Sequence, residues 1–284
     1  MTRPAGPAGA SVALLAGGGD FPIDLTRILV ARGESVFVAA LDGVADPQAF
    51  PGAEVRMMRL GQLGSLLDEL RRRRIGDIVM LGGLPRPSFG ALRPELATLK
   101  YLPYFARAFR GGDDHLLRRV VRFFEDYGFR VHGPAEIAPE LAAPLGPLGS
   151  LRANEVQREL FLRGFSLLDA LSPFDIGQAA ILADHRVVAV EAAEGTDEMI
   201  ARVAELVARR RLRLDKRDGV LVKAPKTGQD LRVDMPAIGP QTLHNIARAG
   251  LSGIALRAGQ VLVGDRAGLG RLADELGLFV EGVA

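Results

Sequence analysis

Acidic and basic side chains recur in the second half of the chain, at places where apolar segments end. Carboxylates bind Mg²⁺, commonly one or two of them together with phosphate oxygens and water. Lysines stabilise the negative charge of a phosphoryl group. Both residue types occur together here, which suits chemistry on a phosphate group held with a metal ion. The stretches are D-I-G-Q (175–178), E-A-A-E-G-T-D (191–197), K-A-P-K (223–226) and R-V-D-M-P-A-I-G (232–239).

Asp234 is the acid with the most unusual setting. It stands between Val233 and Met235, so we expect a carboxylate within an apolar strand end. A charged group in apolar surroundings needs a partner or a metal ion. The pattern therefore favours a functional role for Asp234, with a structural salt bridge or a cap as the alternatives. A solvated or capping role is an equal alternative for three other acids, Glu191, Glu194 and Asp197.

The glycine stretch A-G-G-G-D-F-P (16–22) lies between a predicted strand and a predicted helix. Backbone N–H groups at a helix N-terminus bind anions, and glycines let a phosphate approach closely. Gly17 and Gly19 match the dinucleotide fingerprint G-x-G-x-x-G, whereas Pro22 replaces its third glycine. Asp42 follows the next predicted strand, where a ribose-binding acid would stand. The stretch predicts a phosphate or nucleotide contact, with a tight turn or a full dinucleotide site as alternatives.

Two further stretches of the first half carry polar side chains. G-G-L-P-R-P (82–87) follows an apolar strand pattern and would place Arg86 at the carboxyl edge of a parallel sheet, where ligands bind. Arginine can hold a phosphate with two hydrogen bonds, although a surface arginine is an equal interpretation. In R-G-G-D-D-H-L-L-R-R (110–119), Asp113 can cap a helix and Asp114 suits its first turn. A ligand or metal contact by these acids and His115 is the alternative.

Several classes of site are excluded by residues that the chain lacks. It has no cysteine, so disulfides, thiolate nucleophiles and cysteine-based metal sites are ruled out. The four histidines show no zinc-ligand spacing, and neither a P-loop nor a G-x-S-x-G motif occurs. The formal net charge is only +2, so nucleic acid is not an expected partner. No apolar run approaches the roughly 18 residues of a membrane helix.

The length of 284 residues favours two domains. We expect a disordered leader over residues 1–10 in a cytoplasmic protein, because Pro and Gly stand where a signal peptide needs an apolar stretch. Four prolines between 134 and 150 predict a linker. The expected domains are then an N-terminal one over 11–133 and a C-terminal catalytic and lipid-binding one over 151–284.

Strand and helix patterns alternate through the first half, which predicts an α/β fold with a Rossmann-like parallel sheet. Its strands are expected at 11–16, 35–41, 54–60, 77–83 and 129–133, and its helices at 23–32, 63–74, 91–110 and 113–127. The second half predicts a mixed α/β domain with helices near 154–171, 196–211, 240–250 and 265–276. Hairpins are expected at 179–192 and 254–264, strands or strand ends at 219–225, 230–239 and 278–283, and a cap at Thr196.

In their order along the chain, these stretches resemble the LpxI-type UDP-2,3-diacylglucosamine pyrophosphatases, from Leu14 to about Phe279. The carrying motifs are A-G-G-G-x-x-P, R-P (86–87), G-D-D-x-L-L-R-R (112–119), D-I-G-Q, E-G-T-D, K-A-P-K and R-V-D-x-P-x-I-G. No single motif is decisive, whereas their ordered combination is specific.

The resemblance implies hydrolysis of UDP-2,3-diacylglucosamine to lipid X and UMP, a cytoplasmic step of lipid A synthesis that needs a divalent metal, Mg²⁺ or Mn²⁺. It also implies two domains with substrate between them, a homodimer, and an essential aspartate that is Asp234 here. It leaves room for peripheral contact with the inner face of the cytoplasmic membrane.

The candidate residues follow from the stretches and the resemblance together. The candidate catalytic residues are Asp234, Lys223 and Lys226, and the candidate metal ligands are Asp234, Glu191 and Asp197. The candidate substrate-binding residues are Gly17, Gly18, Gly19, Arg86, Asp113, Asp114, Asp175, Gln178, Glu194, Thr196 and Thr242. Two other functions stay open: an NAD-linked oxidoreductase based on the glycine stretch, and a nucleotide-sugar or lipid binding module without turnover.

Overall fold

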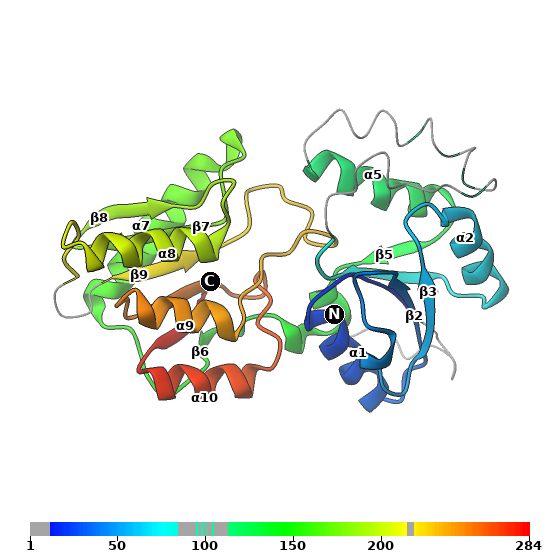
Figure 1. Ribbon diagram of the computed structural model, residues 1–284, viewed down its shortest axis with the longest axis horizontal. Helices are drawn as coiled ribbons and strands as arrows, with labels where there is room; N and C mark the ends of the chain where they lie inside the picture. The colour runs from blue at the N-terminus through cyan, green and yellow to red at the C-terminus, as the bar shows by residue number, and fades with distance from the viewer. Residues whose placement is uncertain are drawn as a thin grey trace. The chain divides into compact units, whose positions relative to one another are not determined.

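The computed structural model describes residues 12–84, 95, 98, 101, 104, 113–214 and 219–284, without the side chains of 113–115. The expected leader, Arg86 and most of the expected helix over 91–110 lie outside these residues. The chain divides into two compact units (Figure 1). The first comprises Met1–Ala138 with Arg232–Asp234, and the second comprises Pro139–Leu231 with Met235–Ala284.

The first unit is built on a five-stranded parallel sheet in the order β3-β2-β1-β4-β5 (Figure 1). The order reverses between β1 and β4, which is the point where open α/β sheets usually bind ligands. The five strands are β1 (Val12–Ala16), β2 (Val36–Leu41), β3 (Glu54–Met58), β4 (Asp77–Leu81) and β5 (Arg130–His132).

Helices cover this sheet because its central strands are buried on both faces, as their continuous apolar runs require. Helix α1 (Phe21–Ala31) follows β1, and its Leu25 and Leu29 are fully buried. Helices α2 (Leu63–Arg72) and α5 (Asp113–Asp126) share one core with alternate residues of the strands. A short 3₁₀ helix, η1 (Pro47–Ala49), joins β2 to β3.

The second unit contains a six-stranded mixed sheet in the order β6-β11-β10-β9-β7-β8 (Figure 1). The middle strands β9, β10 and β11 are parallel, whereas the pairs β7–β8, β7–β9 and β6–β11 are antiparallel. The strands are β6 (Gly146–Pro147), β7 (Ala179–Ala183), β8 (Arg186–Val190), β9 (Val220–Lys223), β10 (Gly253–Arg257) and β11 (Phe279–Val283). A parallel sheet and a mixed sheet confirm the predicted fold class.

The two faces of the second sheet carry different helices. Helix α7 (Glu155–Leu171) packs on β7 and β9 through one apolar cluster. It begins with a capping box in which the side chains of Asn154 and Gln157 each bond to the other's backbone amide. Helices α8 (Thr196–Ala208), α9 (Pro240–Arg248) and α10 (Arg266–Leu276) share the cluster on the opposite face. Leu221 belongs to that second cluster, and Lys223, two residues on, therefore points to the same side.

Three local predictions were wrong. Residues 231–233 form a turn, and Ala237 makes only an isolated bridge to Leu262, so 230–239 is no strand. Residues 254–264 form no hairpin, because β10 pairs in parallel with β9 and β11 and the residues after it bond to other segments. Thr196 is the first residue of α8 rather than its cap; Gly195 holds the cap position, with φ of 84°. The hairpin at Asp184 and His185 is confirmed.

The segment over 134–150 is folded. It contains α6 (Pro134–Ile137), the 3₁₀ helix η4 (Pro139–Leu141) and β6. Leu141 and Ala143 are buried, and the backbone of Ala143 exchanges hydrogen bonds with Val261 and Gly259 in the second unit. The two compact units meet along the chain inside this segment, at Ala138 and Pro139.

Candidate active site

The register of the second sheet brings several predicted residues to one edge. Ala179 at the start of β7 pairs with Lys223 at the end of β9, and Ala180 pairs with Val190 at the end of β8. Gln178 precedes β7 and Glu191 follows β8, so both must lie near Lys223. Leu256 of β10 also pairs with Lys223, which adds Arg257 to the same edge. This is the carboxyl edge of the parallel strands, where ligands usually bind.

Lys223, Thr196 and Glu191 form a hydrogen-bonded chain at this edge. The ammonium Nζ of Lys223 donates to Thr196 Oγ1 at 2.8 Å, and Thr196 Oγ1 donates to Glu191 Oε2 at 2.9 Å. Only 7% of the Lys223 surface is exposed. Burial lowers the pKa of Lys223, while the negative charges of Glu191 and Asp197 act in the opposite direction.

The backbone around Glu191 is packed too closely for any residue but glycine at position 177. A Cβ on Gly177 would lie 2.4 Å from the carbonyl oxygen of Glu191. This approach lets the amide of Gln178 donate to Glu191 Oε2 at 3.4 Å, while its carbonyl accepts from Ala224. The D-I-G-Q stretch thus holds the Glu191 carboxylate through its backbone.

Asp197 and Thr242 connect the first turns of α8 and α9. Thr242 is buried, and its hydroxyl donates to Asp197 Oδ1 at 3.3 Å. Glu194 lies just outside this group and forms an ion pair of 2.8 Å with Arg202 of α8. The structure therefore brings Gln178, Glu191, Thr196, Lys223, Asp197 and Thr242 together, whereas Glu194 faces a surface arginine.

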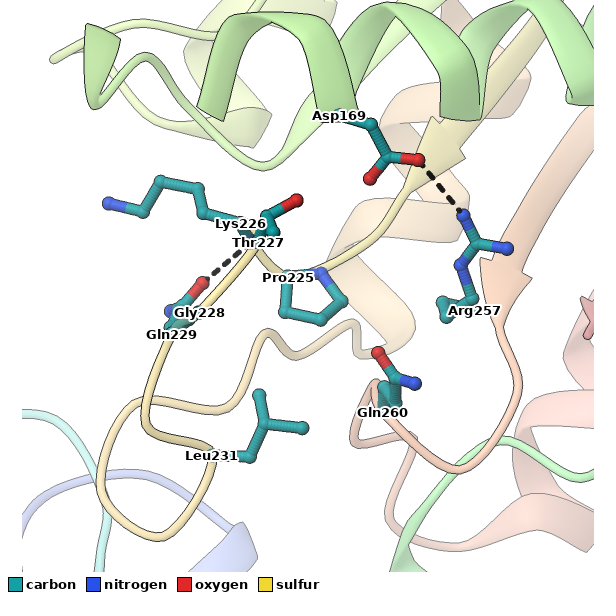
Figure 2. Close-up of a pocket in the computed structure, with 9 residues that line it drawn as sticks. All are labelled: Asp169, Pro225, Lys226, Thr227, Gly228, Gln229, Leu231, Arg257 and Gln260. Carbon is teal, nitrogen blue, oxygen red and sulfur yellow. Dashed lines mark hydrogen bonds and ion pairs between the residues drawn. The ribbon is translucent and has the colours of Figure 1, made fainter. Parts of the chain in front are cut away.

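Lys226 belongs to a neighbouring group that lines a small open hollow. Its ammonium forms an ion pair with Asp175, the residue that ends the 3₁₀ helix η5 (Ser172–Phe174) in a left-handed conformation. The hollow measures about 220 Å³. Figure 2 shows the Lys226 side chain directed away from Arg257, the other cation of the hollow. The lining residues are Asp169, Pro225, Lys226, Thr227, Gly228, Gln229, Leu231, Arg257 and Gln260.

Arg257 is a charged residue of this edge that the sequence predictions missed. Its guanidinium lies over the ring of Phe165, 4.3 Å from the centroid, and 3.7 Å from Asp169 Oδ2. Figure 2 shows the pair with Asp169 on one side of the hollow. The signal was available, because Arg257 closes the apolar run of β10 as Lys223 closes that of β9.

Asp234 follows a turn that packs on the first unit. Arg232 Nη1 lies 2.7 Å from Glu125 Oε1 of α5, and Val233 packs against the apolar core formed by α2 and α5. Asp234 is half-buried and lies outside any strand, so the expected strand end is not present. The apolar–polar–apolar pattern Val233-Asp234-Met235 is typical of a strand. Here Val233 packs into the core of the first unit from a turn and not from a strand.

The glycine loop of the first unit uses its own amide groups. Gly17 donates to Leu81, and Gly18 and Gly83 exchange two hydrogen bonds, each of 2.8 Å. A Cβ on Gly17 would lie 2.5 Å from the carbonyl oxygen of Gly83. The loops after β1 and β4 are thus joined where a dinucleotide fold leaves a crevice, which argues against an NAD site. Gly19, at φ of 95°, has open space where a Cβ would stand.

The remaining predicted residues fall at or beyond the limits of the described chain. Arg86 lies outside it, and Asp113 and Asp114 begin α5 with side chains that also lie outside it. Within the described ranges, no group of three or more His, Asp or Glu side chains could hold a metal ion. Glu191 and Asp197 belong to the second unit and Asp234 to the first.

Fold and site define a class: a two-unit α/β protein whose second unit holds a buried lysine, threonines and carboxylates at the carboxyl edge of its sheet. Residues 11–141 match the LpxI N-terminal domain, and residues 144–281 match the LpxI C-terminal domain. The chain belongs to the LpxI family, as the sequence resemblance predicted.

A curated relative and two solved structures are also similar to parts or all of the chain. The UDP-2,3-diacylglucosamine pyrophosphatase LpxI of Caulobacter vibrioides is 42% identical over 272 residues, which cover 95% of this chain and 96% of that protein. The glycinamide-RNase-transformylase T of Mycobacterium tuberculosis is 19% identical, with a TM-score of 0.23 over 64% of this chain and 44% of that one.

A biotin carboxylase domain of a thermophilic 2-oxoglutarate carboxylase is 12% identical, with a TM-score of 0.24 over 75% of this chain and 43% of that one. Both TM-scores are too low to support an argument about the fold. Among the helices of the described chain, none is long and apolar enough to cross a membrane.

Proposed function

We propose that this chain hydrolyses the pyrophosphate bond of UDP-2,3-diacylglucosamine to lipid X (2,3-diacylglucosamine 1-phosphate) and UMP, as a step of lipid A synthesis. The observation that carries the proposal is the 42% identity, over almost the full length of both chains, to a protein named for this pyrophosphatase activity. The two family domains together span residues 11–281 with little interruption.

The chemistry of the second unit supports a pyrophosphate substrate. Lys223 would stabilise the charge that develops on a phosphoryl oxygen, and a buried ammonium acts more strongly there than one in water. Lys226 follows the end of β9 and Arg257 is the last residue of β10, so both add positive charge at the same edge. Thr242 and Gln178 are the proposed polar contacts to the rest of the substrate.

Asp234 is the proposed essential carboxylate. It either positions the water that attacks the phosphorus on the sugar side or binds a divalent cation, Mg²⁺ or Mn²⁺. A single carboxylate fits such a cation when substrate phosphates and water complete the coordination. When bound, the cation would neutralise charge on the pyrophosphate oxygens. Hydrolysis in ¹⁸O-labelled water should then label the phosphate of lipid X; label in UMP would contradict attack on the sugar side.

The setting of this reaction belongs to the same proposal. We propose that the enzyme acts in the cytoplasm as a homodimer. We also propose that it binds peripherally to the inner face of the cytoplasmic membrane, since its substrate carries two acyl chains. Sedimentation with and without vesicles of bacterial phospholipid tests the homodimer and the membrane binding. A monomer that does not bind the vesicles would refute both and would leave the catalytic proposal unchanged.

A further inference from the structure

Lys223 is a buried cation surrounded by a hydroxyl acceptor and two carboxylates. A lysine with only 7% of its surface exposed requires hydrogen-bond acceptors and compensating negative charge for its ammonium. Thr196 provides an acceptor at 2.8 Å, and the charges of Glu191 and Asp197 both act on the ammonium. Each acid is fixed in turn, Glu191 by Thr196 and the amide of Gln178, and Asp197 by Thr242.

We propose that Glu191 and Asp197 balance the charge of Lys223 rather than bind a metal ion, and that Thr196 is a positioning residue for the Lys223 ammonium. The role of Thr196 rests on the proposed function, because Lys223 is taken there to act on the pyrophosphate. The charge balance does not rest on it and concerns the folded second unit alone.

The donors and acceptors of Lys223, Thr196 and Glu191 fix the direction of the hydrogen bonds that link them. Lysine has three donors and no acceptor, so Thr196 Oγ1 must accept from Lys223. A hydroxyl has one hydrogen, so that hydrogen is free to go to Glu191 Oε2. That carboxylate oxygen also accepts from the amide of Gln178. A divalent cation at Glu191 Oε2 would have to displace these donors, and a cation anywhere on this carboxylate would stand close to an ammonium of the same sign.

The charge balance is tested by a double-mutant cycle on thermal unfolding. E191Q removes one of the two compensating charges and leaves the ammonium buried, so we expect Tm to fall by roughly 5 °C or more. K223M removes the ammonium and keeps an apolar stem of similar length. In the K223M background, the change E191Q should then shift Tm by less than about 2 °C. Equal shifts in both backgrounds would overturn the charge balance.

A control comes from helix α8, which begins with Thr196 and Asp197. Glu205 of α8 pairs with the exposed Arg209, so E205Q should leave Tm almost unchanged in either background. A loss with E205Q as large as that with E191Q would show that any carboxylate near α8 matters equally, and would count against the proposal.

Direct binding of Mn²⁺ tests whether the two acids hold a metal ion. Calorimetric titration of the intact protein with Mn²⁺ should give the same affinity for the parent, E191Q and D197N. A tenfold or greater loss of Mn²⁺ affinity in either variant would overturn the assignment. This measurement needs no turnover, so its result stands whether or not the proposed reaction occurs.

The role of Thr196 is tested by removing and restoring its hydroxyl. T196V keeps the shape but not the hydroxyl, and kcat should fall about 10- to 100-fold with KM changed less than threefold. T196S restores the hydroxyl and should recover most of kcat. If T196V keeps kcat, or if T196S is as impaired as T196V, Thr196 does not position Lys223. If neither the parent nor any variant hydrolyses UDP-2,3-diacylglucosamine, the proposed function is refuted instead.

Discussion

Gly18 and Gly83 exchange two backbone hydrogen bonds of 2.8 Å across the point where the strand order of the first sheet reverses. In dinucleotide-binding folds this place receives the pyrophosphate of the cofactor. Here the loops after β1 and β4 satisfy each other, and the glycines of the A-G-G-G stretch allow their close contact.

This contact predicts a loss of stability when Gly17 gains a side chain. A Cβ at Gly17 would lie 2.5 Å from the carbonyl oxygen of Gly83, so G17A must push the two loops apart. We expect the free energy of unfolding to fall by about 2 kcal/mol. G83A is the matched control, because a Cβ there would meet its nearest atom only at 3.8 Å. Urea titrations that give equal stability for the parent and G17A would contradict the packing role.

Asp77 makes the stability of the first unit depend on pH. Arg130 and His132 both bond to Asp77, and they lower its pKa to about 2 despite partial burial. Because the pKa of Asp77 is lower in the folded than in the unfolded protein, its carboxylate stabilises the fold at pH values above the unfolded pKa of about 3.9. This stabilisation is lost as the pH falls through 2. D77N should therefore cost about 1–2 kcal/mol at pH 7, since Arg130 is largely exposed.

The same variant should be nearly neutral below pH 2, where most of the Asp77 carboxyl groups of the parent are protonated. Chemical unfolding of both proteins across this range measures the difference. A cost that stays constant down to pH 2 would show that D77N acts through packing and not through the charge of Asp77.

Arg232 and Glu125 are expected to hold the turn that precedes Asp234. Their side chains are 33% and 42% exposed, so the pair contributes at most about 1 kcal/mol, or roughly fivefold in rate. E125R should reduce kcat/KM by about that factor with little change in Tm. Adding R232E restores an ion pair of opposite direction and should recover part of the loss. A double variant worse than the product of the two single ones would refute this role.

Local patterns predicted most of the strands, the main helices and one hairpin of the described residues. Alternating apolar residues around Asp184 and His185 indicated a two-residue turn, and both residues have positive φ there. The capping box of Asn154 and Gln157 at the start of α7 and Pro240 at the start of α9 likewise act within a few residues. Such signals survive because they depend on neighbours in the chain.

The errors arose where distant segments decide the outcome. Residues 261–263 look like the second strand of a hairpin, but Val261 and Val263 bond to Ala143 and Leu141 instead. The segment 232–234 belongs by its contacts to the first unit, although the residues on either side of it belong to the second. No local pattern contains that information. The sequence predicted which residue types lie at the edge of the second sheet. The hydrogen bonds that link Lys223 through Thr196 to Glu191 could be seen only once the strand register was known.

Asp234 links the family assignment to the chemistry. D234A removes the carboxylate and should reduce kcat by about 10³-fold or more while Tm stays close to that of the parent. D184N, in the exposed hairpin turn, is the matched control and should keep full activity. An active and folded D234A protein would remove Asp234 from the mechanism.

The most direct measurement is hydrolysis of UDP-2,3-diacylglucosamine by the purified chain, with release of UMP and lipid X followed in Mg²⁺, in Mn²⁺ and in EDTA. We predict equal amounts of UMP and lipid X with either metal, none in EDTA, and almost none from D234A. Absence of UMP under every condition, from a folded protein that binds the substrate, would contradict the assignment as a pyrophosphatase.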